Sequence, residues 1–364
     1  MRLVSLSLRN YRNYARLDLE LSPRLNVFLG KNAQGKTNLL EAVSLLALSS
    51  SQRARRESEL VGKLGGEARI EAVAESHGRQ VEMAIKLTVI VGEADRTSKT
   101  IRIDGQARRA VDLPGELRAT VFWPEDLNLV KGGPEHRRRF LNQMLVQVEK
   151  GYGRALAGYR RVLDQRNSLL KRVAAGFEPL AALDVWDEEL ARHGELILRA
   201  RRAAASQLGP LAAGNHEAIA AGEAFDLAYE SPDLPLAQQL AVSRSEDLRR
   251  GSTSVGPHRD DLRIEVGGAD ARSFASQGQQ RSAVVSLKLA EADLVEARSG
   301  ERPILLLDDV LSELDGDRRL ALLARVGDRG QVIVTSVEAE PFPAELIERA
   351  TVRCISAGHV TACA

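Results

Sequence analysis

The chain of 364 residues carries 51 basic and 50 acidic side chains, and its formal net charge of +1 argues against a histone-like polycation or an acidic disordered tail. Hydrophobic residues make up 44% and charged residues 28%, as in ordinary globular proteins, and the length predicts two or three domains. No apolar run approaches the ~18–20 residues of a membrane span, and the N-terminus lacks the apolar core of a signal peptide, so we expect no membrane partner.

Strand patterns open the chain. Apolar and polar residues alternate up to residue 29, after which residues 37–48 have their apolar side chains at helical spacing. Strands are therefore predicted at 4–8, 17–21, 25–29, 70–73, 81–91, 101–103 and 119–123. The short last strand ends at a proline, Pro124.

The spacing of apolar residues changes in the middle of the chain. From about residue 134 to residue 211, Leu and Ala recur at helical spacing among many charges, which predicts about three helices of roughly 15–22 residues. Glycines and the Gly209-Pro210 pair separate them, and residues 231–235 read as an irregular linker. A helix near 279–298 and strands at 303–308 and 331–335 follow. We expect an α/β domain formed by residues 1–120 and 251–364, split by a mainly helical lobe of residues 121–250.

The near-neutral total conceals an uneven distribution of charge. Residues 131–172 hold 11 basic and 3 acidic side chains, a local net charge of +8, whereas residues 301–364 hold 7 and 11, a net charge of −4. The chain also has far more Arg than Lys, which either codon bias or phosphate recognition by the planar guanidinium explains. The only cysteines, Cys354 and Cys363, are too few for a disulfide framework or a zinc site, and they favour a reducing cytoplasm.

Residues 30–37, Gly-Lys-Asn-Ala-Gln-Gly-Lys-Thr, match the phosphate-binding pattern G-x-x-x-x-G-K-[ST]. They follow a predicted strand and open a predicted helix, which is the context that this pattern requires. Glycines let main-chain N–H groups converge on phosphates, and the positive end of the helix dipole adds to them. We expect Lys36 to reach the β- and γ-phosphates and the Thr37 hydroxyl to bind Mg²⁺. A glycine-rich strand-to-helix turn without a ligand is the alternative.

A short apolar strand, residues 304–307, ends in two carboxylates, Asp308 and Asp309. The carboxyl ends of buried parallel strands face the ligand crevice, so Asp308 is expected to hold Mg²⁺ and Asp309 to orient or deprotonate the attacking water. A strand that merely ends in a solvated acidic turn would look the same, and the phosphate-binding loop is what favours the functional interpretation.

A third element precedes the helix near 279–298. Ser276 stands 32 residues before Asp308, and a Ser-Glu-Leu-Asp segment follows the two carboxylates at 312–315. Taken alone, Ser276 is an ordinary helix N-cap. The order of phosphate loop, serine motif, acidic strand end and following loop resembles the ABC-type ATPases, in which the signature serine contacts the γ-phosphate held by the other subunit.

Longer segments resemble the RecF family, a bacterial group within the SMC-like class of ABC-type ATPase heads, along nearly the whole chain. The segments that carry this resemblance are residues 8–14, 30–38, 124–127, 131–132, 137–141, 256–261, 276–279 and 307–310. Asn142 and the run Ser51-Gln52-Arg53 depart from the family pattern, which tends to have Asp and Ser-His-Arg there. No histidine follows the strand at 331–335, where transporter-type heads have one, so we expect slow hydrolysis.

The resemblance implies an ABC-type ATPase head with a phosphate-loop core, an antiparallel β subdomain and an inserted helical second lobe. It implies ATP and Mg²⁺ as cofactors, with Lys36, Asp308 and Asp309 catalytic and Thr37 and Asp308 as metal ligands. The residues expected to contact ATP are Gly30, Lys31, Asn32, Ala33, Gln34, Gly35, Lys36, Thr37 and Asn38 on one subunit and Ser276, Gly278 and Gln279 on the other.

The resemblance also implies a weak, DNA-dependent ATPase in DNA replication, recombination and repair after DNA damage, including the SOS response. ATP would join two heads on DNA at single-strand gaps or junctions, in the cytoplasm and associated with the nucleoid. RecO and RecR would be partners in loading RecA. The expected DNA contacts are Arg53, Arg55, Arg56, Arg137, Arg138, Arg139, Arg160 and Arg161.

Several alternatives remain open. The arginines could form a solvated helical face, and Arg137, Arg138 and Arg139 could cap helices or bind carboxylates of the 256–261 block. His258 and Arg259 could sense nucleotide, or Arg259 could pair with a neighbouring aspartate. Other readings of the whole chain are another SMC-like head, a P-loop phosphotransferase acting on a small molecule, or a transporter ATPase subunit. The predicted helices are too short for the long coiled-coil arms of SMC proteins.

Overall fold

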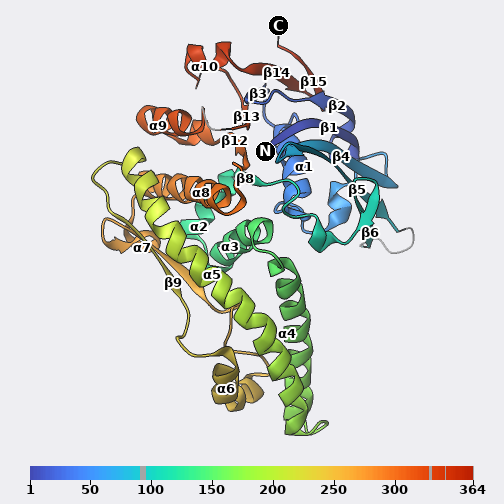
Figure 1. Ribbon diagram of the computed structural model, residues 1–364, viewed down its shortest axis with the longest axis vertical. Coiled ribbons are helices and arrows are strands. Elements are labelled where there is room, and N and C mark those ends of the chain that lie inside the picture. The colour runs from blue at the N-terminus through green and yellow to red at the C-terminus, as the bar shows by residue number, and fades with distance from the viewer. Residues whose placement is uncertain (91–95, 328–329, 341, 364) are drawn as a thin grey trace.

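A computed structural model describes residues 1–90, 96–327, 330–340 and 342–363. In this part of the chain the strands form three sheets, and the helices of the middle segment extend away from two of them as a long arm (Figure 1). Both termini lie at the end of the molecule that holds these two sheets. Residue 91, at the end of a predicted strand, lies outside the described residues.

The sheet that carries the phosphate loop has the order β15-β14-β3-β13-β12-β8. Its strands are β3 (Leu25–Leu29), β8 (Ala119–Phe122), β12 (Ile304–Asp308), β13 (Val332–Ser336), β14 (Thr351–Ser356) and β15 (His359–Ala362). All neighbours are parallel except β14 and β15. The carboxyl ends of β3, β12 and β13 therefore meet at one edge, as predicted for a ligand site.

A second, antiparallel sheet covers this one. Its order is β2-β1-β4-β5-β6-β7, with β1 (Arg2–Tyr11), β2 (Tyr14–Glu20), β4 (Glu67–Ser76), β5 (Arg79–Val89), β6 (Thr97–Ile103) and β7 (Gln106–Arg108). The alternation seen in the sequence turns leucines such as Leu6 and Leu8 inward. The antiparallel β subdomain expected from the sequence is thus present.

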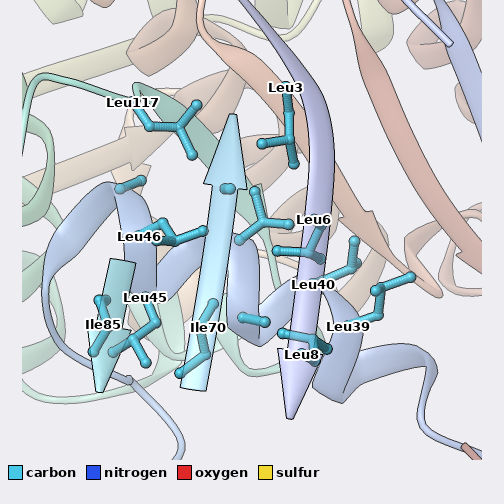
Figure 2. Close-up of a cluster of buried hydrophobic side chains, with 14 of the residues drawn as sticks. Leu3, Leu6, Leu8, Leu39, Leu40, Leu45, Leu46, Ile70, Ile85 and Leu117 are labelled. Carbon is cyan, nitrogen blue, oxygen red and sulfur yellow. The ribbon is translucent and has the colours of Figure 1, made fainter. Parts of the chain in front are cut away.

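Helix α1 (Lys36–Leu48) lies between these two sheets. Figure 2 shows Leu39, Leu40, Leu45 and Leu46 of α1 facing inward residues of the antiparallel sheet. Complete burial of each leucine contributes about 1.5–3 kcal/mol relative to exposure, so the helix that begins at the phosphate loop is held firmly. The other face of the parallel sheet packs against α8 (Gln277–Ser299) and α9 (Gly316–Val326).

The arm is built from α3 (Pro134–Val148), α4 (Tyr152–Ala174), α5 (Leu183–Ile219) and α6 (Leu236–Arg250). A three-stranded sheet of β9 (Phe225–Glu230), β10 (Asp261–Val266) and β11 (Ala269–Asp270) packs with them, and α8 contributes side chains to their shared core. The short helices α2 (Asn128–Lys131), α7 (Ala271–Phe274) and α10 (Ala344–Glu348) complete the fold in the described ranges. The domain boundary placed at residue 251 remains a prediction, and β9 pairs with β10 across it.

Two expectations for the arm were wrong. Helix α5 is 37 residues long, well beyond the predicted 15–22, and Gly209-Pro210 lies inside it. Proline removes one hydrogen bond and normally ends or kinks a helix. Buried neighbours on both sides of the pair, among them Leu208 and Ala212, keep the helix packed through it. Tertiary packing thus overrides the local signal.

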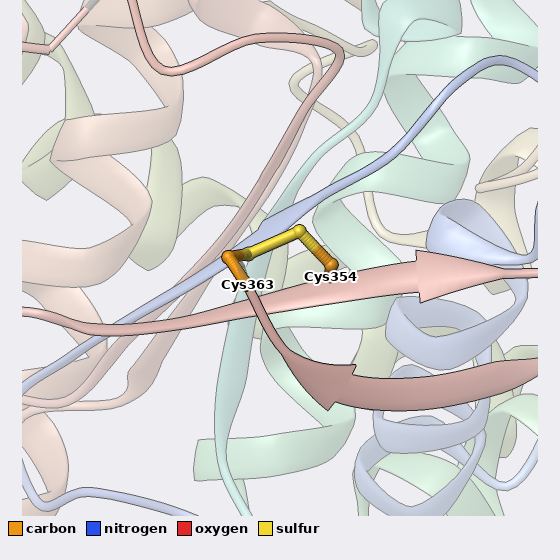
Figure 3. Close-up of a disulfide and its surroundings, with 2 residues drawn as sticks. All are labelled: Cys354 and Cys363. Atoms are coloured by element: carbon orange, nitrogen blue, oxygen red, sulfur yellow. A yellow bond between two sulfur atoms is a disulfide. The ribbon is translucent and has the colours of Figure 1, made fainter.

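The cysteines, from which we expected no disulfide framework, form one disulfide (Figure 3). Cys354 lies on β14 and Cys363 directly follows β15, so the hairpin brings their Cα atoms to 5.0 Å, within the range that a disulfide spans. Nine positions separate them in the sequence, and their pairing depends on the hairpin. Among the described residues, none of the helices combines the length and the apolar composition needed to cross a bilayer.

Candidate nucleotide site and basic cleft

The phosphate loop connects the end of β3 to the start of α1. Ala33 and Gly35 have φ angles of 64° and 119°, the left-handed conformation that lets the loop curl. Gly30 lies so close to β14 that a Cβ there would be 2.4 Å from the carbonyl oxygen of Ile355. Local geometry alone therefore favours glycine at both positions of the pattern.

Lys36 begins α1 and is almost fully buried. Its ammonium donates hydrogen bonds to the main-chain oxygens of Gly30, at 2.5 Å, and Lys31, at 3.2 Å, so its charge is held over the loop. Burial lowers the pKa of Lys36, while the nearby carboxylates of Asp309 and Asp308 act in the opposite direction. Such a charge is placed to offset the negative charge of a bound phosphate.

Asp308 and Thr37 meet as the sequence predicts. The Thr37 hydroxyl donates to Oδ1 of Asp308 at 3.2 Å, and the Thr335 hydroxyl of the neighbouring strand β13 donates to the same oxygen at 2.7 Å. Burial raises the pKa of Asp308, against the two hydroxyls and Arg53, which lower it. A hydroxyl and a carboxylate side by side are the hard oxygen ligands that Mg²⁺ prefers, so the residues fit that ion.

Asp309 follows directly and has a left-handed backbone, with a φ of 52°. Its main-chain N–H donates to the carbonyl oxygen and, at 3.3 Å, to the hydroxyl of Thr335. This turn separates the two carboxylates, because Asp308 ends the strand and Asp309 begins the next turn. The arrangement allows one carboxylate to hold a metal ion while the other faces a substrate water.

The tip of the phosphate loop is braced by both ends of the chain. The side-chain amide of Asn13 donates to the Gln34 carbonyl oxygen at 2.9 Å. On the other side, the turn of the disulfide-bonded hairpin donates two main-chain N–H groups to Gln34, from Ala357 at 2.7 Å and Gly358 at 3.0 Å. The sequence analysis missed this brace, since nothing in the local pattern links residue 34 to residues 13 and 357.

The signature segment lies at the start of α8. The Ser276 hydroxyl accepts from the N–H of Gln279 at 3.3 Å, and the Gln279 side chain accepts from the N–H of Ser276 at 2.8 Å, forming a capping box. Ser276 is exposed, and a Cβ on Gly278 would lie 2.8 Å from the Arg318 guanidinium. Among the described residues, no hydrogen bond joins Ser276, Gly278 or Gln279 to the phosphate loop of the same chain.

A cleft of about 880 Å³ separates the loop after α1 from α3 and α4. Its basic lining residues are Arg53, Arg55, Arg138, Arg139, Arg160 and Arg201, and its acidic lining residue is Glu135. The cleft thus gathers five of the eight arginines expected to contact DNA. Arg161 is exposed on α4 and Arg56 is exposed after α1, and neither lines this cleft.

Arg137 corrects the predicted basic surface. Its side chain is buried, and both oxygens of Asp261 accept from its guanidinium at 2.7 Å, with further bonds to the carbonyl oxygens of Leu129 and Gly132. This matches the alternative in which the arginine binds a carboxylate of the 256–261 block. Arg137 therefore holds α3 to β10 and is withdrawn from the DNA contacts.

Two residues of the 256–261 block, Pro257 and His258, line the cleft. The His258 ring bonds to the Tyr159 hydroxyl at 2.7 Å, and Arg259 donates to the carbonyl oxygen of Thr253. Burial lowers the pKa of His258 to about 4, and the charges of Arg259 and Arg138 act in the same direction. Within the described residues Arg259 bonds to the main chain of Thr253 and forms no ion pair with Asp260 or Asp261, whereas a role in sensing nucleotide stays a prediction.

Comparisons with known proteins agree with this architecture. The family model described as "RecF/RecN/SMC N terminal domain" matches residues 2–353. The curated "DNA replication and repair protein RecF" of Roseiflexus castenholzii is 40% identical and covers 99% of both chains, and that of Listeria monocytogenes is 37% identical with the same coverage.

Solved structures give the same result. A structure titled "recombination mediator protein RecF-ATP in RecFOR pathway" superposes with a TM-score of 0.89 at 30% identity, covering 100% of this chain and 97% of that one. An Smc head bound to a domain of ScpA has a TM-score of 0.56 at 14% identity, covering 99% and 96%, which shows a shared fold alone. By family match, full-length similarity and structure, this chain belongs to the RecF family of DNA replication and repair proteins.

Proposed function

We propose that the protein is an ATP-dependent DNA-binding protein of recombinational repair and replication restart, in which ATP joins two heads on DNA. The observation that carries the proposal is the pairing of a complete phosphate loop with an exposed signature serine on the same chain. ATP would bind residues 30–38, with Mg²⁺ held by Thr37 and Asp308. The related RecF-ATP structure supports nucleotide binding by this fold.

The head-to-head arrangement explains why Ser276 faces solvent. ATP held by Lys36 of one subunit would receive the Ser276 hydroxyl, and the segment 276–279, of the other subunit. Phe274 lies beside the signature and is 76% exposed, and Leu320 on the adjacent α9 is 55% exposed. A second copy would cover such apolar side chains, and nucleotide binding and dimerisation would therefore favour each other.

Hydrolysis would reopen the dimer. Asp309 would orient the attacking water, and Lys36 would stabilise the charge that develops on the γ-phosphate. The residues after β13, Val337 and Glu338, include no histidine to assist. We therefore propose a slow, DNA-dependent ATPase that serves as a binding switch.

The basic cleft is the proposed contact with the DNA backbone. Arg53, Arg55, Arg138, Arg139 and Arg160 line it, with Arg56 and Arg161 nearby in sequence. Contacts with phosphates release condensed counterions, so affinity would fall steeply with salt. We propose binding at single-strand gaps or junctions, in the cytoplasm, with RecO and RecR as partners in loading RecA. The solved relative belongs to the RecFOR pathway, which supports these partners.

Molecular mass in solution, measured with and without ATP, tests the proposal. The wild type should become a dimer with ATP and Mg²⁺, whereas Ser276→Arg should stay a monomer that still binds ATP. Ser98→Arg is the matched control, since Ser98 is also exposed but lies on β6, away from the signature segment, and this variant should dimerise normally. A wild type that stays monomeric with ATP and DNA present contradicts the proposal.

A further inference from the structure

Glu41 is a buried carboxylate in the otherwise apolar middle of α1. It lies four residues after Thr37 and is 1% exposed. Burial would raise the pKa of Glu41, but hydrogen bonds from Arg12 and Ser51, together with the charges of Arg12 and Arg53, hold the pKa below its ordinary value. The carboxylate is therefore charged in the fold, and its partners decide what it does.

The partners of Glu41 come from two other segments. Arg12, at the turn between β1 and β2, donates to both carboxylate oxygens at 2.8 and 2.7 Å. Ser51, in the loop after α1, donates its hydroxyl to Oε1 at 2.6 Å, and Arg53 lies 3.7 Å away. The same Ser51 oxygen accepts the N–H groups of Arg53 and Ala54 at 3.0 Å, so the bond to Glu41 also shapes the loop.

The loop is joined to the nucleotide site at a second point. The Arg53 guanidinium donates to Oδ1 of Asn38, which directly follows the phosphate-loop pattern, at 3.3 Å. The Asn38 amide in turn donates to Asn13 at 2.8 Å, and Asn13 holds the tip of the phosphate loop through Gln34. Residues 38 and 41 thus attach the loop to two successive turns of the helix that would carry the phosphates.

The opposite side of the loop faces the basic cleft. Residues 49–55 line it together with Arg138, Arg139 and Arg160. Arg53 also lines a second cavity of about 450 Å³, which includes Arg12 and Lys288. Residues 49–55 therefore contact the phosphate-binding helix α1 and also line the basic cleft.

We propose that Glu41 is a positioning residue that transmits the state of the nucleotide site to the basic cleft. It would contact neither ATP nor DNA. By fixing Ser51 and Arg53 relative to the phosphate-binding helix, it makes the conformation of residues 49–55 depend on whether ATP is bound. ATP and a polyanion in the cleft are then coupled, each raising the affinity of the protein for the other. The cleft side of this inference rests on the proposed function.

Glu41→Gln tests the coupling. Glutamine has nearly the same shape, but it lacks the charge and directs an N–H₂ group toward guanidinium donors. Glu57→Gln is the matched control, because Glu57 lies just beyond the loop, accepts from Lys99 and lines neither cavity. Ser51→Ala is the second variant, since it removes the loop bond and leaves the Arg12 pair intact should Glu41→Gln fold poorly.

The first measurement needs no DNA. Trypsin cuts after Arg53, Arg55 and Arg56, and ATP with Mg²⁺ should change the rate of cutting in the wild type and in Glu57→Gln by about fivefold or more. In Glu41→Gln the loop should be cut faster, with ATP changing the rate less than about twofold. Its ATP affinity should stay within about threefold of the wild type. The inference is overturned if Glu41→Gln is cut at the wild-type rate with the wild-type response to ATP. It is also overturned if ATP does not change the rate at which the wild type is cut.

The second measurement titrates duplex DNA with and without ATP. The gain in DNA affinity that ATP brings should shrink to less than about twofold in Glu41→Gln, while the affinity without ATP is unchanged. Wild-type DNA binding that does not respond to ATP contradicts the proposed function, and the proteolysis result still decides the role of Glu41. An ATP response of DNA binding that survives in both Glu41→Gln and Ser51→Ala overturns the inference.

Discussion

The Thr37 hydroxyl donates to Oδ1 of Asp308 at 3.2 Å, although 271 positions separate the two residues in the sequence. The contact joins the first turn of α1 to the end of β12, and the Thr335 hydroxyl holds the same carboxylate oxygen from β13. The two proposed magnesium ligands are therefore already adjacent, so an ion would not first have to bring them together.

Asp308→Asn should separate metal-dependent from metal-independent nucleotide binding. Loss of the carboxylate should weaken binding of ATP with Mg²⁺ by about 2–3 kcal/mol, roughly 30- to 150-fold, with little effect on ATP in excess chelator. Because burial raises the pKa of Asp308, the neutral asparagine should not lower the thermal midpoint. Calorimetric titration and thermal unfolding measure these effects, and equal losses with and without Mg²⁺ would assign Asp308 another role.

Asp309→Asn should have a different effect. If Asp309 orients the attacking water, hydrolysis should fall by about 100-fold or more, whereas ATP affinity should change little. The dimer formed with ATP should then persist instead of dissociating as nucleotide is consumed. Phosphate release and solution mass, followed on one sample, provide the check. Unimpaired phosphate release would rule out this role.

Charge reversal of Arg139 and Arg160 tests the cleft as a DNA surface. Both side chains are exposed and line the cleft from α3 and α4. The double substitution to Glu should weaken DNA binding at every sequence and reduce the salt slope by about 2, since each phosphate contact contributes roughly 0.9. Arg16→Glu is the control, because Arg16 is also exposed but lies on β2. Unchanged affinity and slope in the double variant would exclude the cleft.

Arg166 is a structural residue, although it lies in the basic stretch of the sequence. It is fully buried and donates to Asp187 at 2.5 Å, and to Asp247 and Thr253 at 2.8 Å. Arg166→Met should lower the free energy of unfolding by about 3–5 kcal/mol, because Asp247 loses its ion-pair partner and Asp187 loses one of its two. The exposed neighbour Arg161→Met should stay within about 0.5 kcal/mol in the same urea titration. Comparable stability of the two variants would contradict this assignment.

His258 should make the fold sensitive to mild acid. Its folded pKa is about 4, against about 6.5 unfolded, so between these values the unfolded chain binds a proton that the folded chain does not. The free energy of unfolding should therefore decrease as the pH is lowered, by about 2 kcal/mol between pH 7 and pH 5. This part of the pH dependence should be absent from His258→Gln. Urea unfolding of both chains at the two pH values measures it. Identical pH dependence would show that His258 does not contribute.

The parts that the sequence predicts correctly are those where neighbouring residues act together. The phosphate loop is one short segment that contains Gly30, Gly35 and Lys36. The alternation of apolar and polar residues around Leu6 and Leu8 likewise decides which face of the strand is buried. The helix at Gln277–Ser299 and the strand ending at Asp308 likewise follow from local periodicity. The class of fold could thus be predicted, and so could the meeting of Thr37 and Asp308 at one edge of the sheet.

What could not be predicted depends on partners far away in the sequence. Arg137 looks like its neighbour Arg139 until β10 places Asp261 beside it. Thr335 offers no motif, and its bond to Asp308 depends on the order of the strands. Glu41 carried one weak signal, a charge on a helix that is otherwise apolar on nearly every side, and only the fold supplies its partners.

The position of β3 has a consequence for how the protein is made. This strand, which leads into the phosphate loop, pairs with β13 and β14, and those strands begin at Val332 and Thr351. At ~5–20 residues per second, a ribosome delivers the loop tens of seconds before the strands that flank it. A ribosome-bound chain that stops before residue 330 should therefore fail to retain ATP. A truncated product would then lack the nucleotide on which the proposed binding to DNA depends.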